Sequence, residues 1–414
     1  MLGKIKRSFL FRWIYKLPWL LRGYHLLFTI LGAIIYRRPS RFIRVIGITG
    51  TKGKTTALEL LNSIFESAGE KTALLSSVRV KIGEKSKRNL TENSMPGRMY
   101  IQRFLRKAVN AGCAYAFVEA TSQGAVLYRH ALINWAAAAL TNIHPEHIEA
   151  HGSYEKYREA KLRFLAYAGG ENAPIFLNGE EEEKDFFERE LKGNKIIIYS
   201  TEGLRDLPES SREYLPGHFS KQNVALAVAV AKEFGIPDEK IWEGIANFKG
   251  APGRVDIVQR KPFKVVVDYA HTPESLAAIY KALKEELSGG ARLTCLLGAA
   301  GGGRDKWKRP AMGKTAAEYC DRIILTDEDP YDEDSAEIIS EIKKGIREAG
   351  FPENEILEMV DRRAAIREAI KMARPGDTII STGKGSESWI HIKKGEKIPW
   401  NEKQIFEEEL GIKK

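Results

Sequence analysis

The chain has 414 residues, of which 43% are hydrophobic, and this length predicts two or three globular domains. Lys and Arg total 65 and Asp and Glu total 55, but residues 1–44 hold ten of the basic residues and no acidic one. The rest of the chain is therefore neutral, with 55 basic residues against 55 acidic ones. A neutral body gives no general affinity for nucleic acid, so we expect no nucleic-acid partner.

The three cysteines, Cys113, Cys295 and Cys320, are far apart in the sequence and have no metal-ligand spacing. We expect all three to be core residues of a protein kept in a reduced, cytoplasmic setting.

Residues 1–40 are at once basic, aromatic and apolar. Their longest apolar run, residues 24–36, is 13 residues long, whereas a membrane-spanning helix needs about 20. Two interpretations stay open for this basic apolar segment. It is an interfacial helix on an anionic membrane face, which would make the chain a peripheral membrane protein, or it is a pair of helices packed on the domain that follows.

A β-branched run at residues 42–48 predicts a buried strand, and it leads into a glycine-bearing loop and a helix that begins near Thr55 and ends at Gly69. Gly50 and Gly53 let the loop turn tightly, and Lys54 adds a positive charge where the helix dipole is also positive. Such a loop binds a nucleoside triphosphate, and the Thr55 hydroxyl can ligate magnesium. The strict P-loop pattern is missed by one position, because Ile48 stands where it requires glycine.

The next elements alternate in type: a strand at 74–80, a helix at 98–111, and strands at 114–119 and 136–141. This rhythm predicts an α/β fold with a mostly parallel sheet and helices on both faces. Glu119 ends one of these strands, at the sheet edge where ligands gather, and its carboxylate can hold magnesium.

Residues 142–152 contain three histidines and two glutamates, and a third glutamate stands nearby at 155, but their spacing fits no zinc pattern. Residues 171–215 are strongly charged, and we expect them to be surface that closes the first domain. Strands at 264–268, 293–297 and 322–326, with helices at 224–234 and from 274, predict a second α/β domain over 217–414. Its glycine-rich loop at 298–303, followed by Arg304 and Lys308, can wrap an anion.

Several blocks of this sequence resemble the Mur ligase family and occur in the family's order. They are Thr-Gly-Thr-Lys-Gly-Lys-Thr-Thr at 49–56, Asn-Ile-His-Pro-Glu-His-Ile-Glu-Ala-His-Gly at 142–152, Asp-Tyr-Ala-His-Thr-Pro at 268–273 and Gly-Lys-Gly-Ser-Glu at 383–387. The resemblance spans about residues 40–400 and implies a P-loop-type central ATPase domain at 41–215 and a Rossmann-like domain at 216–414. The family's N-terminal UDP-binding domain is not expected, since only about 40 residues precede the loop.

The resemblance also implies site residues. ATP would be bound by Gly50, Thr51, Lys52, Gly53, Lys54, Thr55, Thr56, Asn223, Arg254, Asp268 and His271. Two Mg²⁺ ions would be held by Thr55, Glu119, His147 and a carbamylated Lys161. The substrates would contact Ser94, Met95, Pro96, Ser122, Arg129, Arg304, Lys308, Asp329, Pro330, Gly383 and Glu387. Lys54, Lys161 and His271 would be the catalytic residues.

The tripeptide-forming branch of the family is the best match. The implied reaction is ATP-dependent amide-bond formation through an acyl phosphate, which adds an amino acid to a UDP-N-acetylmuramoyl-peptide in cell-wall synthesis. One departure concerns the amino acid: Tyr331 stands where diaminopimelate-adding members have an arginine that grips the distal carboxylate. The carboxylates around it would instead favour a distal amine, as in lysine.

Three alternatives remain. The chain could act on a lipid-linked muropeptide with residues 1–40 on the membrane, or it could be a folylpolyglutamate-synthase-like ligase, which the Gly-Lys-Gly-x-Glu block disfavours. An ATP-binding regulatory relic is the third alternative, and the joint presence of Lys54, Glu119, His147, Lys161 and His271 argues against it.

Overall fold

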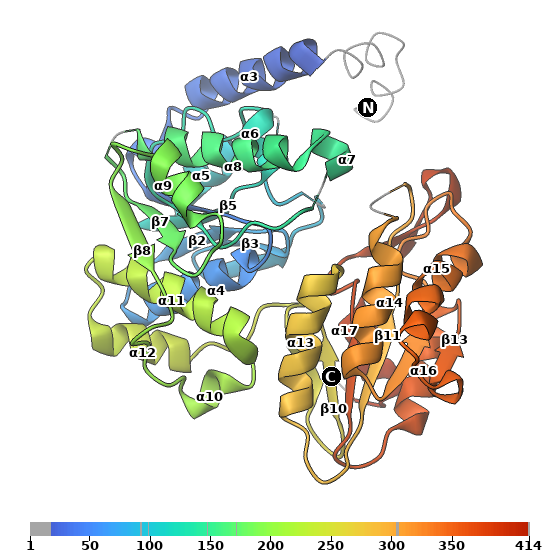
Figure 1. Ribbon diagram of the computed structural model, residues 1–414. Helices are drawn as coiled ribbons and strands as arrows, with labels where there is room; N and C mark the ends of the chain where they lie inside the picture. Colours follow the sequence, from blue (N-terminus) through green and yellow to red (C-terminus); the bar gives the residue numbers. More distant parts are fainter. Residues whose placement is uncertain are drawn as a thin grey trace. The chain divides into compact units, whose positions relative to one another are not determined.

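The computed structural model describes residues 18–412 except 92, 98, 147, 171, 304 and 305. The chain divides into two compact units, Met1–Asp206 with Gln222–Asn247, and Leu207–Lys221 with Phe248–Lys414 (Figure 1). Residues 222–247, expected in the second domain, therefore pack with the first unit. They do so because helix α12 (Asp238–Ala246) lies against α4 (Lys54–Ser67). At this contact a Cβ on Gly244 would come within 2.4 Å of the Ile64 Cα.

The first unit is built on an eight-stranded sheet in the order β4-β3-β2-β5-β1-β6-β7-β8. Its strands are β1 (Arg44–Thr49), β2 (Thr72–Leu75), β3 (Arg79–Ile82), β4 (Lys85–Arg88), β5 (Tyr115–Glu119), β6 (Trp135–Leu140), β7 (Ile175–Asn178) and β8 (Ile196–Tyr199). From β2 to β8 every pair is parallel, and only β3 and β4 run antiparallel to their neighbours. The predicted α/β class with a mostly parallel sheet is confirmed.

Helices cover both faces of this sheet. The other helices that belong wholly or in part to this unit are α3 (Pro18–Ile35), η1 (Pro39–Arg41), α5 (Tyr100–Asn110), α6 (Ser122–Val126), α7 (Ile148–His151), α8 (Tyr154–Gly169), α9 (Lys184–Glu190) and α11 (Gly217–Glu233). Residues of α5, α8 and α9 form one apolar core with Val45, Val118 and Leu140 of the sheet. On the opposite face Phe65 of α4 packs edge-on against Phe117 of β5, with ring centroids 5.2 Å apart. The central strands are therefore buried on both faces, as their continuous β-branched and alanine-rich runs require.

Two expectations for this unit were wrong. Residues 74–80 are not one strand, because the chain bends at Ser76 and Ser77 and returns antiparallel as β3. Residues 171–215 are not all surface, since all four residues of β7 are buried within the sheet. The apolar run of β7 is short and lies in a stretch rich in charged residues, so the sequence did not indicate a strand there.

The second unit has a six-stranded sheet in the order β13-β12-β11-β14-β10-β9. Its strands are β9 (Asp256–Gln259), β10 (Lys264–Val267), β11 (Leu293–Leu297), β12 (Arg322–Leu325), β13 (Ile356–Glu358) and β14 (Thr378–Ser381), and β15 (Trp389–His391) pairs with β16 (Lys397–Pro399). Its helices are α10 (Glu209–Arg212), α13 (Pro273–Glu285), α14 (Lys308–Tyr319), α15 (Ser335–Glu348), η2 (Glu353–Glu355), α16 (Arg362–Met372), η3 (Lys393–Gly395) and α17 (Glu402–Glu409). Helices α13, α14 and α15 form a core on one face of the sheet, and α16 and α17 form one on the other.

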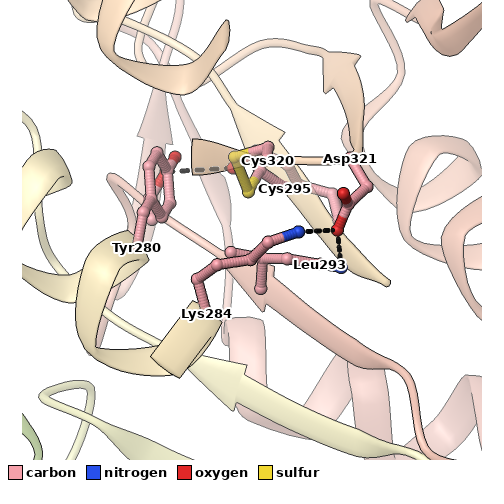
Figure 2. The surroundings of a disulfide bond; sticks show 8 residues. Tyr280, Lys284, Leu293, Cys295, Cys320 and Asp321 are labelled. Carbon is pink, nitrogen blue, oxygen red and sulfur yellow. Dashed lines mark hydrogen bonds and ion pairs between the residues drawn. A yellow bond between two sulfur atoms is a disulfide. The ribbon is translucent and has the colours of Figure 1, made fainter. Parts of the chain in front are cut away.

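A disulfide joins Cys295 of β11 to Cys320, which lies just before β12 (Figure 2). Beside it the Asp321 carboxylate accepts hydrogen bonds from Lys284 Nζ and from the Leu293 backbone N–H. The expectation that all three cysteines are buried is confirmed, but the expectation that all are reduced is wrong. Parallel pairing of β11 with β12 brings together two cysteines that are 25 residues apart in the sequence. Cys113 is a buried free thiol.

Within the described residues, no helix is long and apolar enough to cross a membrane.

Candidate active site

The glycine-bearing loop after β1 is held against the end of β6. The Thr51 N–H donates to the Asn142 carbonyl (2.9 Å), and the Lys52 N–H donates to Asn142 Oδ1 (2.8 Å). The Thr141 hydroxyl donates to the Lys52 carbonyl at 2.6 Å. These hydrogen bonds hold the loop backbone against the end of β6.

Both loop glycines occupy places that a side chain would disrupt. Gly50 has φ +147° and a Cβ there would lie 1.8 Å from Thr141 Oγ1. Gly53 has φ +83° and a Cβ would lie 2.3 Å from Asn223 Oδ1. Asn223, which was predicted to lie near the nucleotide, is thus brought to this loop although 170 residues separate it from Gly53. Thr56, one helical position beyond Thr55, is half-buried.

Two lysines converge on the carbonyl of Gly50. Lys54 Nζ donates to it at 2.8 Å and also to the Thr51 carbonyl at 2.9 Å. Lys161 Nζ, from α8, donates to the same oxygen at 2.8 Å and is only 2% exposed. Burial, and then the charge of Lys54, hold the pKa of Lys161 well below its usual value.

Thr55 and Glu119 meet at the carboxyl ends of β1 and β5. Glu119 Oε2 accepts from the Thr55 hydroxyl at 3.1 Å and from the Ser77 N–H at 2.9 Å, and it is 3% exposed. The Ser77 hydroxyl lies 3.2 Å from Thr55 Oγ1. A carboxylate and two hydroxyls are the hard oxygen donors that Mg²⁺ prefers, so this donor set fits the ion.

The second metal set is described only in part. His147 lies outside the described residues, and Lys161 is held by its bond to the Gly50 carbonyl. In the described ranges, no group of three or more His, Cys, Asp and Glu could hold a metal. Lys52 Nζ forms an ion pair with Glu146 at 2.8 Å, next to this set.

The predicted acceptor residues gather around α6. Arg129 Nη1 donates to the Met95 carbonyl at 2.8 Å, which places Arg129 beside the buried Met95 and Pro96 of the loop that includes Ser94. Ser122 Oγ lies 3.0 Å from His151 Nε2. Burial, and then the charge of Lys161, lower the pKa of His151.

In the second unit, Asp268 and His271 hold the turn after β10. Asp268 accepts backbone N–H groups of Val255 (2.8 Å) and Ala270 (2.7 Å), and His271 Nδ1 lies 2.7 Å from the Tyr269 carbonyl. The Arg254 guanidinium stacks 4.0 Å from the centre of the Tyr269 ring. The structure therefore shows these side chains organising a turn, in the part of the chain where the family resemblance predicts ATP contacts.

A buried charged cluster connects the loops after β12 and β14. Lys384 Nζ donates to Asp329 Oδ1 (2.8 Å) and to Glu387 Oε2 (2.7 Å), and Tyr269 donates to Glu387 Oε1 (3.0 Å). Gly253 is required here, since its Cβ would lie 2.1 Å from the Ser386 nitrogen. Asp329, Gly383 and Glu387, which were predicted separately, are thereby brought together.

Glu328 adds a third carboxylate at the edge of this cluster. It is 6% exposed, its Oε2 has no hydrogen-bond partner among the described residues, and that oxygen would be 2.4 Å from a Cβ on Gly383. Burial, together with the charge of Asp329, raises the pKa of Glu328 to about 7. A buried carboxylate oxygen with no donor is the kind of group that a ligand cation satisfies.

The remaining predicted substrate residues belong to α14, precede it in the sequence or follow Asp329, and the His391 N–H donates to Asp329 Oδ1 at 2.8 Å. Lys308 is 7% exposed at the start of α14, and Arg304 lies outside the described residues. Pro330 and Tyr331 border a cavity of about 630 Å³ that neither Lys384 nor Glu387 lines. The ring of Tyr331, in the position where diaminopimelate-adding ligases have arginine, stacks on that of His391 at 4.9 Å.

Several residues of these sites escaped the sequence analysis. Ser77 and Tyr157 each touch a loop or metal residue, and Tyr157 OH lies 2.9 Å from Thr51 Oγ1. Asn142 fixes the loop, and Lys384 and Glu328 complete the charged cluster. Asn142 and Lys384 had a local signal, since both stand inside quoted blocks of the sequence. Tyr157 and Glu328 also had one, because they stand within four residues of Lys161 and Asp329, which the resemblance named. Only Ser77 depends on a contact between distant segments.

Two family models match this chain: the Mur ligase middle domain over residues 48–214 and the Mur ligase, glutamate ligase domain over 253–385. The chain is 33% identical over 407 residues to a UDP-N-acetylmuramyl-tripeptide synthetase of Roseiflexus sp., covering 90% of this chain and 79% of that protein. The chain belongs to the Mur ligase family. This family membership confirms the resemblance that the sequence blocks predicted, and with it an ATP-dependent amide ligase.

Solved structures agree with this assignment. A UDP-N-acetylmuramoyl-L-alanyl-D-glutamate–2,6-diaminopimelate ligase aligns with TM-score 0.59 and 27% identity, over 89% of this chain and 78% of the other. A folylpolyglutamate synthase of Mycobacterium tuberculosis, solved with ADP and AMPPCP, aligns with TM-score 0.68 and 16% identity, over 86% and 92%. At 16% identity the second likeness shows a shared fold alone.

Proposed function

We propose that this chain is an ATP-dependent ligase that joins an amino acid to the terminal carboxylate of a UDP-N-acetylmuramoyl-dipeptide, on the cytoplasmic side of cell-wall synthesis. The observation that carries the proposal is the loop of the first unit. Its backbone is fixed by Asn142, and it brings Lys54, Thr55 and Glu119 together at the carboxyl edge of a parallel sheet. That edge is where ligands bind in such folds.

The chemistry follows from the poor reactivity of a carboxylate at neutral pH. Transfer of the ATP γ-phosphoryl group to an acceptor oxygen gives an acyl phosphate and ADP. The amine nitrogen of the incoming amino acid then attacks the acyl carbon, inorganic phosphate leaves with the acceptor oxygen, and the amine loses one proton. Lys54 would stabilise the negative charge of the phosphates as they approach the carboxylate.

Magnesium would be held by Thr55 and Glu119, and it would supply charge neutralisation for the phosphates. Carbamylation of Lys161 is part of the proposal, because CO₂ reacts only with a neutral amine. The lowered pKa of Lys161 supports it, since burial beside Lys54 favours the uncharged form of this side chain. His147 would share the second ion with the carbamate.

We also propose that the incoming amino acid has a second positive group. The cluster of Glu328, Asp329 and Glu387 has three carboxylates beside two cations, Lys384 and Arg362, and Arg362 is already paired with Glu402. The aromatic ring of Tyr331 replaces the arginine that would hold a distal carboxylate. Lysine or ornithine therefore suits this site better than diaminopimelate, whose distal carboxylate would be repelled.

Phosphate release tests both parts of the proposal. The full chain is mixed with ATP, Mg²⁺ and UDP-N-acetylmuramoyl-L-alanyl-D-glutamate, and lysine, ornithine and diaminopimelate are added in separate reactions. We expect release that depends on lysine or ornithine, with the matching tripeptide product seen by mass. Release with diaminopimelate alone would refute the argument from the charge of the site. Absence of release with every amino acid would refute the proposal that the UDP-linked dipeptide is the acceptor.

A further inference from the structure

The polarity of helix α3 is reversed relative to an ordinary surface helix. Its inward side contains His25 and Thr29, each 8% exposed, with Ala33 at 1%. Its outward side is apolar: Leu27 (53% exposed), Ile30 (39%), Leu31 (38%), Ile34 (64%) and Ile35 (58%). A helix on the surface of a globular protein normally buries its apolar stripe and exposes its polar side. The exposed apolar stripe of α3 therefore requires a partner.

The inward side of α3 is packed on the first unit, so the orientation of the helix is fixed. The Thr29 hydroxyl donates to the Tyr128 carbonyl at 3.3 Å. A Cβ on Gly32 would lie 3.0 Å from the Met99 side chain. Helix α3 lies on the outside of the unit, next to α5 (Figure 1). Rolling the helix to bury its apolar stripe would expose Ala33 and break these contacts.

The charged residues of the segment that contains this stripe all have one sign. Arg22, Arg37, Arg38 and Arg41 are all exposed, and residues 1–44 contain no Asp or Glu. The ten basic residues of this segment equal the whole net charge of +10. Five of them, at positions 4, 6, 7, 12 and 16, lie before the described residues.

We propose that the outward face of α3, formed by Leu27, Ile30, Leu31, Ile34 and Ile35, docks on an anionic lipid surface. The apolar side chains would enter the boundary between headgroups and acyl chains, and the arginines would pair with lipid phosphates. A bilayer matches both features at once. A second copy of this chain does not, because the exposed arginines of this segment would meet the same arginines of the copy, and the segment has no acidic residue to pair with them.

Docking in this manner would bring the predicted acceptor residues close to the lipid. A Cβ on Gly97, next to the Ser94–Pro96 loop, would lie 3.2 Å from the His25 ring and 3.1 Å from Arg129 Nε. The inward face of α3 therefore touches the loop that the proposed function assigns to the acceptor. The docking itself rests on α3 alone and does not depend on that function.

Vesicle sedimentation of the full chain tests the proposal. The probe is a vesicle of equal parts phosphatidylglycerol and phosphatidylcholine, with pure phosphatidylcholine vesicles as the neutral comparison. The test variant combines Leu27→Ser, Ile30→Ser and Ile34→Ser. Its control combines Ile198→Ser and Ile398→Ser, two similarly exposed side chains (43% and 46%) that do not belong to α3. We expect the test variant to partition on the order of a hundredfold more weakly onto anionic vesicles, and the control to match the unaltered chain.

Two further measurements complete the test. Binding of the unaltered chain should fall as NaCl is raised from about 0.1 M to about 0.5 M, because salt screens the arginine–phosphate attraction. The melting temperature of the test variant should equal that of the unaltered chain, which separates lost docking from lost folding.

Equal sedimentation of the test variant and the unaltered chain, or equal binding of the unaltered chain to neutral and anionic vesicles, would overturn the proposal. A dimer of the unaltered chain in ultracentrifugation that the test variant abolishes would overturn it too, in favour of a protein interface. ATP-dependent ligation on a UDP-linked acceptor without vesicles is measured in parallel, so that a failure of docking is distinguished from a failure of the proposed function.

Discussion

The Gly50 carbonyl accepts hydrogen bonds from two lysines that differ in environment. Lys54 is partly exposed, whereas Lys161 is only 2% exposed. Two ammonium groups on one oxygen repel each other, and the buried one gives up its proton more readily. The same geometry thus leaves one lysine as a cation for phosphates and the other as a candidate for carbamylation.

The first residue-scale prediction concerns Lys54. Lys54→Ala should lower ATP-dependent ligation by on the order of a thousandfold or more, because the charge that stabilises the transferring phosphoryl group is lost. Phosphate release under saturating substrates measures this. The exposed Lys107→Ala on α5 is the control and should keep full activity. Ligation by Lys54→Ala at the rate of the unaltered chain would disprove the proposed mechanism.

The second residue-scale prediction concerns Glu328, whose pKa is raised from 4.5 to about 7. Between these values the folded protein binds a proton that the unfolded chain releases, so the free energy of unfolding falls as pH rises through this window. Above about pH 7 the carboxylate is ionised in both states and the full penalty is present. Glu328→Gln should therefore raise the free energy of unfolding near pH 8, by on the order of 2 kcal/mol, and by less near pH 5.

Urea unfolding at both pH values measures that difference, with the exposed Glu348→Gln as the matched control. The same variant should bind a dibasic amino acid more weakly above pH 7, since it has lost one negative charge of the cluster. A gain in stability of equal size at both pH values would contradict the assignment of the raised pKa.

At the scale of elements, parallel strands bring the residues of both candidate sites together at their carboxyl ends. Strands β1 and β5 pair in register up to Ile48 and Glu119, so the loop after β1 must lie beside the Glu119 carboxylate. In the second unit, β11 and β14 pair in the same way, and the loops that follow β12 and β14 bring Asp329 to Lys384. One rule of sheet architecture therefore positions both clusters.

The element-scale prediction concerns the link between β11 and β12. Reduction of the Cys295–Cys320 disulfide opens a loop of 25 residues, and the added entropy of the unfolded chain should cost about 3 kcal/mol of stability. Thermal unfolding with and without dithiothreitol measures this loss. The Cys113→Ala variant should keep the response to reductant, and the double variant Cys295→Ala with Cys320→Ala should not.

Thiol counting gives an independent check of this link. Alkylation of the denatured chain without reductant should modify Cys113 alone, and alkylation after reduction should modify all three cysteines. Three modified cysteines without reductant would show that the pair is not joined.

At the scale of the whole molecule, metal is expected to serve the chemistry and not the fold. Over the described parts of the chain, no group of three or more His, Cys, Asp and Glu forms a site that could tie elements together, and each unit has its own apolar core. Addition of EDTA should therefore reduce ligation to background and leave the melting temperature unchanged. Excess Mg²⁺ should restore the activity. A fall in melting temperature of several degrees with EDTA would instead indicate a structural ion.

The sequence alone determined the α/β class and the succession of strand, glycine-bearing loop and helix over residues 42–69. These features are local: a β-branched run, two glycines and an amphipathic helix follow one another within about 30 residues, and each has a direct backbone cause. The blocks that resemble the family also indicated site residues such as Asn223. The sequence did not show which residues lie next to them in space, as Gly53 lies next to Asn223.

Only the tertiary structure decided the features that depend on distant segments. The donation of the Ser77 N–H to Glu119, the pairing of Cys295 with Cys320 and the burial of β7 between β6 and β8 all follow from strand neighbours that the sequence does not name. The same holds for α3. Two interpretations of this segment are open from its sequence. Packing against Tyr128 and Met99 decided that the polar side of α3 faces inward and its apolar side outward. The spacing of apolar residues predicts that a helix has a polar and an apolar side, but only the contacts of the helix decide which side is buried.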